Sequence, residues 1–256
     1  MYSLGIDSGS TMTKGILFDG KRIVKQMMLP TSARPQKSIY EIYDALRPSE
    51  GCYTVSTGYG RNLLKEADKV ITEITCHAKG SVFLNPDTRC VIDIGGQDCK
   101  VILLDRYQNV VDFLMNDKCA AGTGRFIEMM CKTLDLEGKD LDAVVAGAHG
   151  VPISSMCTVF AESEIVSLLA AGKPPEEIAL GVIESICKRT ANFAQRLQIE
   201  GTVYFSGGLA RYDVFRRQLE KELGHCVSTH PMGQYTGAIG AAVIGWKKSS
   251  RRETAH

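Results

Sequence analysis

Several familiar signatures are missing from this 256-residue chain, and each absence excludes a class of protein. No Cys-x-x-Cys pair occurs among the nine cysteines, which excludes zinc-ribbon, thioredoxin-like and bacterial ferredoxin spacings. The phosphate loop G-x-x-x-x-G-K-[ST] is absent, and so is a G-x-G-x-x-G turn after the first strand-like segment. No run of about 18 or more apolar residues exists, so we expect no membrane partner.

An excess of charge of one sign is also lacking. The chain has 30 Lys+Arg and 29 Asp+Glu residues, and its formal net charge is +1. A nucleic-acid-binding protein normally carries a basic face, whereas here only the tail 247–252 is basic, as expected of a solvated terminus. The first residues enter a strand-like segment without a signal-peptide pattern. We therefore expect a cytoplasmic protein without a nucleic-acid partner.

The apolar pattern predicts an α/β chain with strands early and helices late. We expect strands over 2–7, 14–18, 22–28, 52–57, 90–94, 100–104, 110–115 and 202–205. We expect helices over 36–46, shortly after Gly60, and over 71–84, 122–134, 140–146, 158–170, 175–199, 211–223 and 233–246.

An internal repeat links two of the strand-rich regions. At an offset of 86 residues, the segment IDSGS (6–10) falls on IDIGG (92–96), and Lys14 falls on Lys100. The matches continue with Ile16 on Ile102, Leu17 on Leu103 and Asp19 on Asp105. This spacing predicts two copies of one β-hairpin unit, each with an aspartate and glycines at its turn. The alternative is two similar hairpins without shared chemistry.

Two such turns facing each other could clamp a magnesium triphosphate. Glycine turns let backbone N–H groups approach phosphate oxygens, and Ser10 and Thr11 add hydroxyl donors. Lys14 can place a positive charge against a phosphate. Asp7 and Asp93, at strand ends, are oxygen ligands suited to Mg²⁺, mostly through its waters.

Three short motifs resemble the nucleotide motifs of the superfold shared by sugar kinases, actin and the heat-shock chaperone ATPases. They are DSGSTMTK (7–14), DIGGQ (93–97) and SGG (206–208). The resemblance implies a two-lobed α/β, ribonuclease H-like fold, with one lobe over 1–86, closed by the C-terminal helix 233–256, and a second over 87–232. It implies catalytic roles for Asp7, Asp93 and Gln97, the last orienting a water at the γ-phosphate. The expected ATP/ADP contacts are Gly9, Ser10, Thr11, Met12, Thr13, Lys14, Gly95, Gly96, Gly207, Gly208 and, at the adenine or ribose, Gln234.

Two cysteines stand in matched settings, each just before a predicted helix. Cys119 precedes Gly-Thr-Gly, and Cys157 precedes a helix whose first turn is acidic. A helix N-terminus lowers the pKa of a thiol, so both could be thiolate ligands. A [4Fe–4S] cluster normally takes four ligands, which a two-fold homodimer would supply as two from each chain. The alternative adds Cys131 and Cys187 from the same chain, but both fall inside predicted helices, where core packing explains them more simply.

The chain as a whole resembles the ATP-dependent activators (archerases) of 2-hydroxyacyl-CoA dehydratases, in the same family as the ATP-binding subunits of benzoyl-CoA reductase. The motifs that carry the resemblance are LGIDSGST (4–11), TGYGRN (57–62), VIDIGGQD (91–98), NDKCAAGTGRF (116–126) and SSMCTVFAESE (154–164). It implies a homodimer with one bridging [4Fe–4S] cluster on Cys119 and Cys157. It also implies ATP hydrolysis coupled to transfer of a low-potential electron to an iron–sulfur dehydratase or reductase. A reduced ferredoxin or flavodoxin would be the electron donor.

Two other functions remain open from the residues themselves. One is a small-molecule kinase of the same superfold, in which the cysteines only pack. The other is a regulator that binds ATP as a switch without turnover. His77 and His149 are expected to be surface or capping residues, and the sequence assigns no role to Tyr59, Arg61, Glu162 or Glu164.

Overall fold

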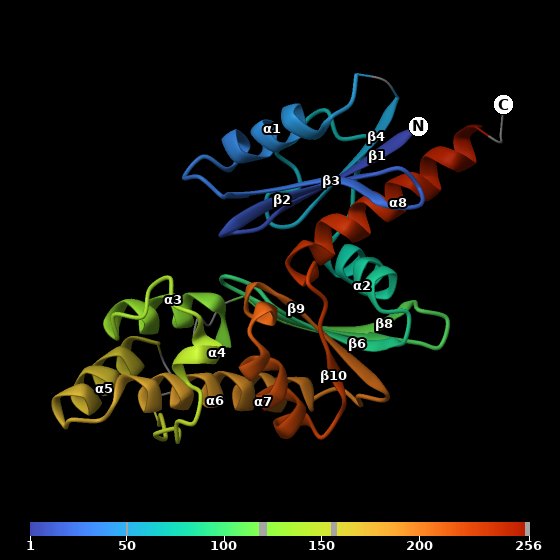
Figure 1. Ribbon diagram of the computed structural model, residues 1–256. Coiled ribbons are helices and arrows are strands. Elements are labelled where there is room, and N and C mark those ends of the chain that lie inside the picture. Colours follow the sequence, from blue (N-terminus) through green and yellow to red (C-terminus); the bar gives the residue numbers. More distant parts are fainter. Residues whose placement is uncertain (50, 118–121, 155–157, 254–256) are drawn as a thin grey trace.

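The computed structural model describes residues 1–49, 51–117, 122–154 and 158–253. Cys119 and Cys157 lie outside these ranges. Two five-stranded mixed sheets form the framework, with helices packed on both faces of each (Figure 1). Among the described residues, none of the helices combines the length and apolar character needed to cross a bilayer.

The first sheet has the strand order β3-β2-β1-β4-β5. β1 runs antiparallel to β2 and parallel to β4. The strands are β1 (Tyr2–Ser8), β2 (Met12–Phe18), β3 (Ile23–Pro30), β4 (Cys52–Thr57) and β5 (Lys69–Val70). Helix α1 (Pro35–Leu46) buries Ile39 and Ile42 against one face, and helix α8 (Thr236–Glu253) buries Ala238 and Ala242 against the other. Because both faces are covered, β1 is almost entirely buried, including its polar residues Ser3, Asp7 and Ser8.

The second sheet repeats this arrangement, with the order β8-β7-β6-β9-β10. Its strands are β6 (Thr88–Ile94), β7 (Cys99–Leu104), β8 (Val110–Asn116), β9 (Thr202–Gly207) and β10 (Val227–Ser228). The main core of the protein lies between one face of this sheet and a set of helices. These are α3 (Gly124–Thr133), α4 (Leu141–Val144), α5 (Thr158–Ala170), α6 (Pro175–Ala194) and α7 (Asp213–Leu223). Helix α2 (Glu73–Leu84) covers the opposite face.

Strand pairing confirms the duplication predicted from the sequence. Asp7 pairs with Lys14 across β1 and β2, and Asp93 pairs with Lys100 at the same register across β6 and β7. Directly opposed residues of an antiparallel pair point to the same face of the sheet. Each aspartate is therefore accompanied by its own lysine at the end of its strand.

Helices α2 and α8 join the two sheets, because they pack closely against each other between them (Figure 1). The close approach depends on glycine: a Cβ atom on Gly240 would collide with the backbone carbonyl of Cys76, and one on Gly80 with that of Thr236. The C-terminal helix α8 therefore packs against the first sheet, which is formed by the N-terminal part of the chain.

Two details of the predicted secondary structure were wrong. The segment after Gly60 forms turns rather than a short helix, and the two-residue strands β5 and β10 were not predicted. A two-residue strand has too few side chains for a period-2 pattern, so only its neighbouring strand reveals it. The division of the chain at residue 86 stays a prediction.

Candidate functional site

A cavity of about 1130 Å³ lies where the ends of the two sheets face each other. Its wall includes the turn after β1, the turn after β6, the start of α2 and the segment after β9. Nearly all residues predicted to bind or hydrolyse ATP line this one cavity: Asp7, Gly9, Ser10, Thr11, Met12, Lys14, Asp93, Gly95, Gly96, Gln97, Gly207, Gly208 and Gln234. The two hairpin units therefore meet across a single space.

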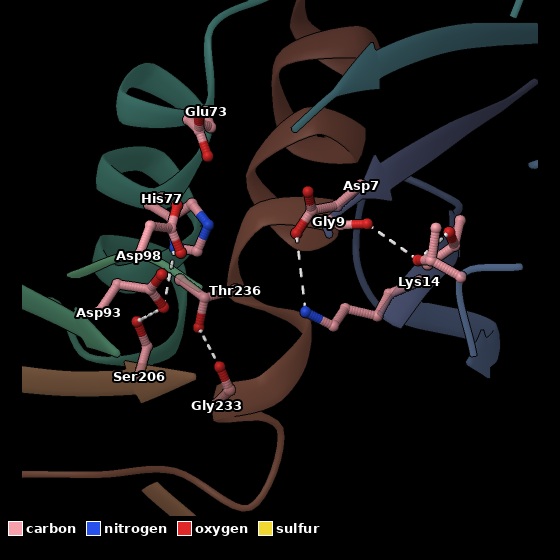
Figure 2. A network of polar contacts seen from close by, with 12 residues as sticks. Asp7, Gly9, Lys14, Glu73, His77, Asp93, Asp98, Ser206, Gly233 and Thr236 are labelled. Carbon is pink, nitrogen blue, oxygen red and sulfur yellow. Dashed lines mark hydrogen bonds and ion pairs between the residues drawn. The ribbon is translucent and has the colours of Figure 1, made fainter. Parts of the chain in front are cut away.

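The first turn presents a lysine and a hydroxyl to the cavity. Lys14 Nζ lies 4.0 Å from Asp7 Oδ2, and its side chain is 17% exposed (Figure 2). Thr11 Oγ1 is buried and has no hydrogen-bond partner among the described residues, so this hydroxyl could donate to a phosphate oxygen. Thr13 points elsewhere: its side chain is buried, and its Oγ1 lies 2.9 Å from Thr31 Oγ1.

The second turn surrounds Asp93 with partners. Ser206 Oγ donates to Asp93 Oδ1 at 2.7 Å, and His77 Nδ1 lies 3.4 Å from the same oxygen (Figure 2). Lys100 Nζ lies 3.3 Å from Oδ2. Burial by itself would raise the pKa of Asp93, but the charges of His77 and Lys100 and the Ser206 hydrogen bond hold it well below its usual value. Asp93 is thus kept ionised inside the protein.

Lys100 is enclosed by three carboxylates. Its Nζ lies 2.5 Å from Asp98 Oδ2 and 3.3 Å from Glu73 Oε2, in addition to its contact with Asp93. Burial opposes the charge on this amine, yet the three carboxylates raise the pKa of Lys100 above its ordinary value. Both lysines line the cavity, but the Lys100 side chain is only 3% exposed and contacts three carboxylates, whereas the Lys14 side chain is 17% exposed and lies 4.0 Å from that of Asp7. The two copies of the hairpin therefore share a strand register but differ in the surroundings of their lysines.

Sequence reasoning missed His77 and Glu73, and it placed His77 wrongly. His77 is buried in the cavity wall rather than on the surface or at a helix cap. Both residues belong to α2, whose N-cap Thr72 accepts a hydrogen bond from the Thr75 amide and fixes where the helix begins. One turn separates Glu73 from His77, so both point the same way. This i, i+4 spacing was visible in the sequence, but only the fold shows that it faces Asp93.

The segment after β9 shapes another part of the wall. Gly207 has φ +97°, and a Cβ atom there would collide with the carbonyl of Ile94, so only glycine lets β9 end against β6. The 3₁₀ helix η2 (Gly208–Arg211) follows. Arg211 stacks on Tyr212, with the guanidinium carbon 4.6 Å from the ring centroid, and both side chains line the cavity. Gln234, in the 3₁₀ helix η3 (Gly233–Tyr235), lines it as well.

The second turn is also hydrogen-bonded to the start of α3. The Gly124 amide donates to the Gly95 carbonyl at 2.9 Å, and the Arg125 amide donates to the Gly96 carbonyl at 3.0 Å. A Cβ atom on Gly124 would lie 3.2 Å from Gly95 O, closer than most real contacts of this kind. The helix that follows the Cys119 segment is therefore held directly by the predicted phosphate-binding turn.

Comparison with known proteins agrees with this arrangement. The model of the BadF/BadG/BcrA/BcrD ATPase family matches residues 4–245. The chain belongs to this family. It is 52% identical to the protein YjiL of Escherichia coli K12 over 98% of this chain and 99% of that protein. It is 42% identical to the (R)-2-hydroxyglutaryl-CoA dehydratase activating ATPase of Acidaminococcus fermentans, again over 98% and 99% of the two chains.

Solved structures confirm the fold of this family member. The activator of the 2-hydroxyisocaproyl-CoA dehydratase from Clostridium difficile, solved with bound ADPNP, superposes with a TM-score of 0.93 at 37% identity. The alignment covers 100% of this chain and 98% of that one. A glucokinase of the ROK family from Streptomyces griseus, with a TM-score of 0.59 at 13% identity over 96% and 100% of the chains, shares the fold alone. The predicted two-lobed sugar-kinase-like fold is thereby confirmed.

The positions of the two predicted cluster ligands are not part of the described structure. Cys119 and Cys157 fall outside the described residues, and within those residues no group of three or more His, Cys, Asp or Glu side chains could hold a metal ion. Cys187 is buried, and Cys131 is partly buried beside the main core. Burial raises the pKa of both thiols, which disfavours the thiolate form that binds iron.

Three residues without an assigned role have clear positions. Tyr59 lines the cavity with 81% of its surface exposed, and Arg61 Nη1 donates to the Gly58 carbonyl at 3.0 Å in the same loop. Glu164 Oε1 accepts from the amide and the hydroxyl of Ser154, at 2.9 and 2.8 Å. Glu164 therefore ties α5 to the segment that precedes Cys157.

Proposed function

We propose that this protein is an ATP-hydrolysing electron-transfer activator for an iron–sulfur 2-hydroxyacyl-CoA dehydratase or a related reductase. The observation that carries the proposal is the convergence of two Asp–Lys hairpins on one cavity whose second turn is hydrogen-bonded to α3. Full-length relatives named as dehydratase activators support the identity of the partner enzyme. We propose that it works in the cytoplasm.

Different residues of the cavity bind the metal ion, the phosphates and the nucleoside. Asp7 and Asp93 would hold Mg²⁺ through its waters, because carboxylate oxygens are ligands that suit this hard cation. Lys14, Thr11 and the glycine turns bind the phosphates, and Gln97 orients the attacking water. The nucleoside occupies the part of the cavity lined by Gly207, Gly208, Gln234, Arg211 and Tyr212.

Cys119 and Cys157 would hold one [4Fe–4S] cluster between two copies of the chain in a homodimer. The cluster supplies a carrier for a single low-potential electron, received from a reduced ferredoxin or flavodoxin. The protein links the two activities through α3, since the phosphate turn Gly95-Gly96 holds the start of the helix that follows the Cys119 segment.

The ligand assignment is tested with protein purified without oxygen. Cys119→Ser and Cys157→Ser are each expected to lose iron and the visible absorption of the cluster while keeping ATP binding. The matched control is Cys226→Ser, which removes an exposed thiol. Normal iron and a normal spectrum in either of the first two variants would show that the assignment is wrong.

A further inference from the structure

The side chains of Gln97 and Arg125 meet beside the nucleotide cavity. Gln97 Oε1 accepts hydrogen bonds from Arg125 Nη2 at 2.8 Å and from Arg125 Nε at 3.2 Å. A guanidinium group has donors only, so the amide atom that faces it has to be the oxygen. Gln97 lines the cavity, and Arg125 lies in the first turn of α3.

This contact occupies the atom that hydrolysis needs. A carbonyl oxygen has two lone pairs, and both are taken by the two donors of Arg125. To direct a water lone pair at the γ-phosphate, Gln97 has to accept a hydrogen bond from that water. In the observed arrangement its amide nitrogen can only donate. Gln97 is therefore close to the phosphate site but not arranged for hydrolysis.

The position of Arg125 is set by α3. Its backbone amide and that of Gly124 are hydrogen-bonded to the carbonyls of Gly96 and Gly95. Gly96 in turn packs on the first turn, because a Cβ atom there would collide with the Thr11 side chain. A shift of α3 relative to this turn would withdraw the guanidinium group from Gln97.

We propose that Arg125 is a positioning residue that restrains ATP hydrolysis, and that a displacement of α3 releases Gln97 to orient the attacking water. The inference rests on the proposed function, in which Gln97 performs this task. ATP turnover is then low until α3 moves, and α3 begins next to the segment that contains Cys119. Binding of the electron acceptor near the start of α3 would thus increase the rate of ATP hydrolysis.

The test is steady-state ATP hydrolysis by the anaerobic dimer without an acceptor enzyme. Arg125→Ala is expected to raise kcat about tenfold or more, the scale of losing hydrogen bonds from a charged group, with the KM for ATP nearly unchanged. Arg125→Lys keeps the positive charge but loses the bidentate contact, so its kcat should lie between that of the unsubstituted protein and that of Arg125→Ala. Lys132→Ala removes an exposed charge from the last turn of the same helix and should leave kcat unchanged.

A second variant shows whether the effect passes through Gln97. Gln97→Ala should lower kcat, and adding Arg125→Ala to it should then have no effect. If kcat is unchanged or lower in Arg125→Ala, Arg125 does not restrain hydrolysis. If Arg125→Ala also raises kcat in the Gln97→Ala background, the effect does not pass through Gln97, and the proposal is likewise contradicted. Absence of ATP turnover in both the unsubstituted protein and Arg125→Ala would contradict the proposed function itself, whereas turnover that is the same in both contradicts only this inference.

Discussion

The duplicated hairpins provide a matched pair of lysines with opposite expected behaviour. Lys100 is enclosed by Asp93, Asp98 and Glu73 at 2.5 to 3.3 Å and is 3% exposed. Removing one partner of such a buried network leaves charges uncompensated, at a cost of about 3–5 kcal/mol. Natural proteins have about 5–15 kcal/mol of stability in total, so Lys100→Met should be folded but much less stable.

Lys14→Met is the control at the corresponding position. Lys14 makes one long ion pair, 4.0 Å from Asp7, whereas Lys100 makes three, so removing Lys14 leaves fewer carboxylates without their partner. We expect it to lose about 1 kcal/mol or less of stability but to bind ATP more weakly. The assay is urea unfolding followed by circular dichroism, together with ATP titration by calorimetry.

Acidification should narrow the stability deficit of Lys100→Met. In the unsubstituted protein the pKa of Asp93 is held low, so its contribution is present at neutral pH and is lost only as the pH falls through that low value. Without Lys100, less charge opposes the burial that raises the pKa of Asp93, so the folded state takes up a proton more readily than it does in the unsubstituted protein. The deficit should shrink between about pH 7 and pH 5. Equal losses in Lys14→Met and Lys100→Met, or a deficit independent of pH, would refute this reasoning.

Two further predictions concern the second turn. In an ordinary helix, Gly124→Ala would increase the stability by about 0.5–1 kcal/mol, but here it should give no gain in stability and should raise the KM for ATP, because the new Cβ would lie 3.2 Å from Gly95 O. In the control Gly122→Ala, the Cβ meets no described atom within 4 Å, so the KM should not change. Equal KM values for the two variants would contradict the tight approach of Gly124 to Gly95. Ser206→Ala removes a buried hydrogen bond to an ionised carboxylate and should cost about 1.5–3 kcal/mol in urea unfolding. It should also raise the pKa of Asp93 in a carboxyl NMR titration, and an unmoved pKa would argue against the bond.

Sequence reasoning predicted those residues of the candidate cavity that follow a local rule. Asp7 and Asp93 were found because the repeat places them at the same point of two hairpins, and pairing with Lys14 and Lys100 follows from strand register. The first glycine turn and Gly207 were found from short motifs. Each of these depends on neighbours a few residues away in the chain.

The remaining parts depend on contacts between distant segments. His77 contacts Asp93 only because α2 covers the second sheet, and Ser206 reaches the same carboxylate only because β9 lies parallel to β6. A lone histidine in a helix gives no sign of this. The Gln97–Arg125 contact was hidden for the same reason, since the segment between them includes both β7 and β8.

Electron delivery driven by ATP is the central claim, and it can be measured in one experiment. The anaerobic protein is reduced and mixed rapidly with an oxidised 2-hydroxyacyl-CoA dehydratase, and loss of the reduced-cluster spectrum is followed with MgATP, with a non-hydrolysable ATP analogue, or without nucleotide. We predict oxidation in one-electron steps with MgATP and little without nucleotide or with the analogue. The same rate under all three conditions, or no cluster spectrum at all, would contradict the proposed function.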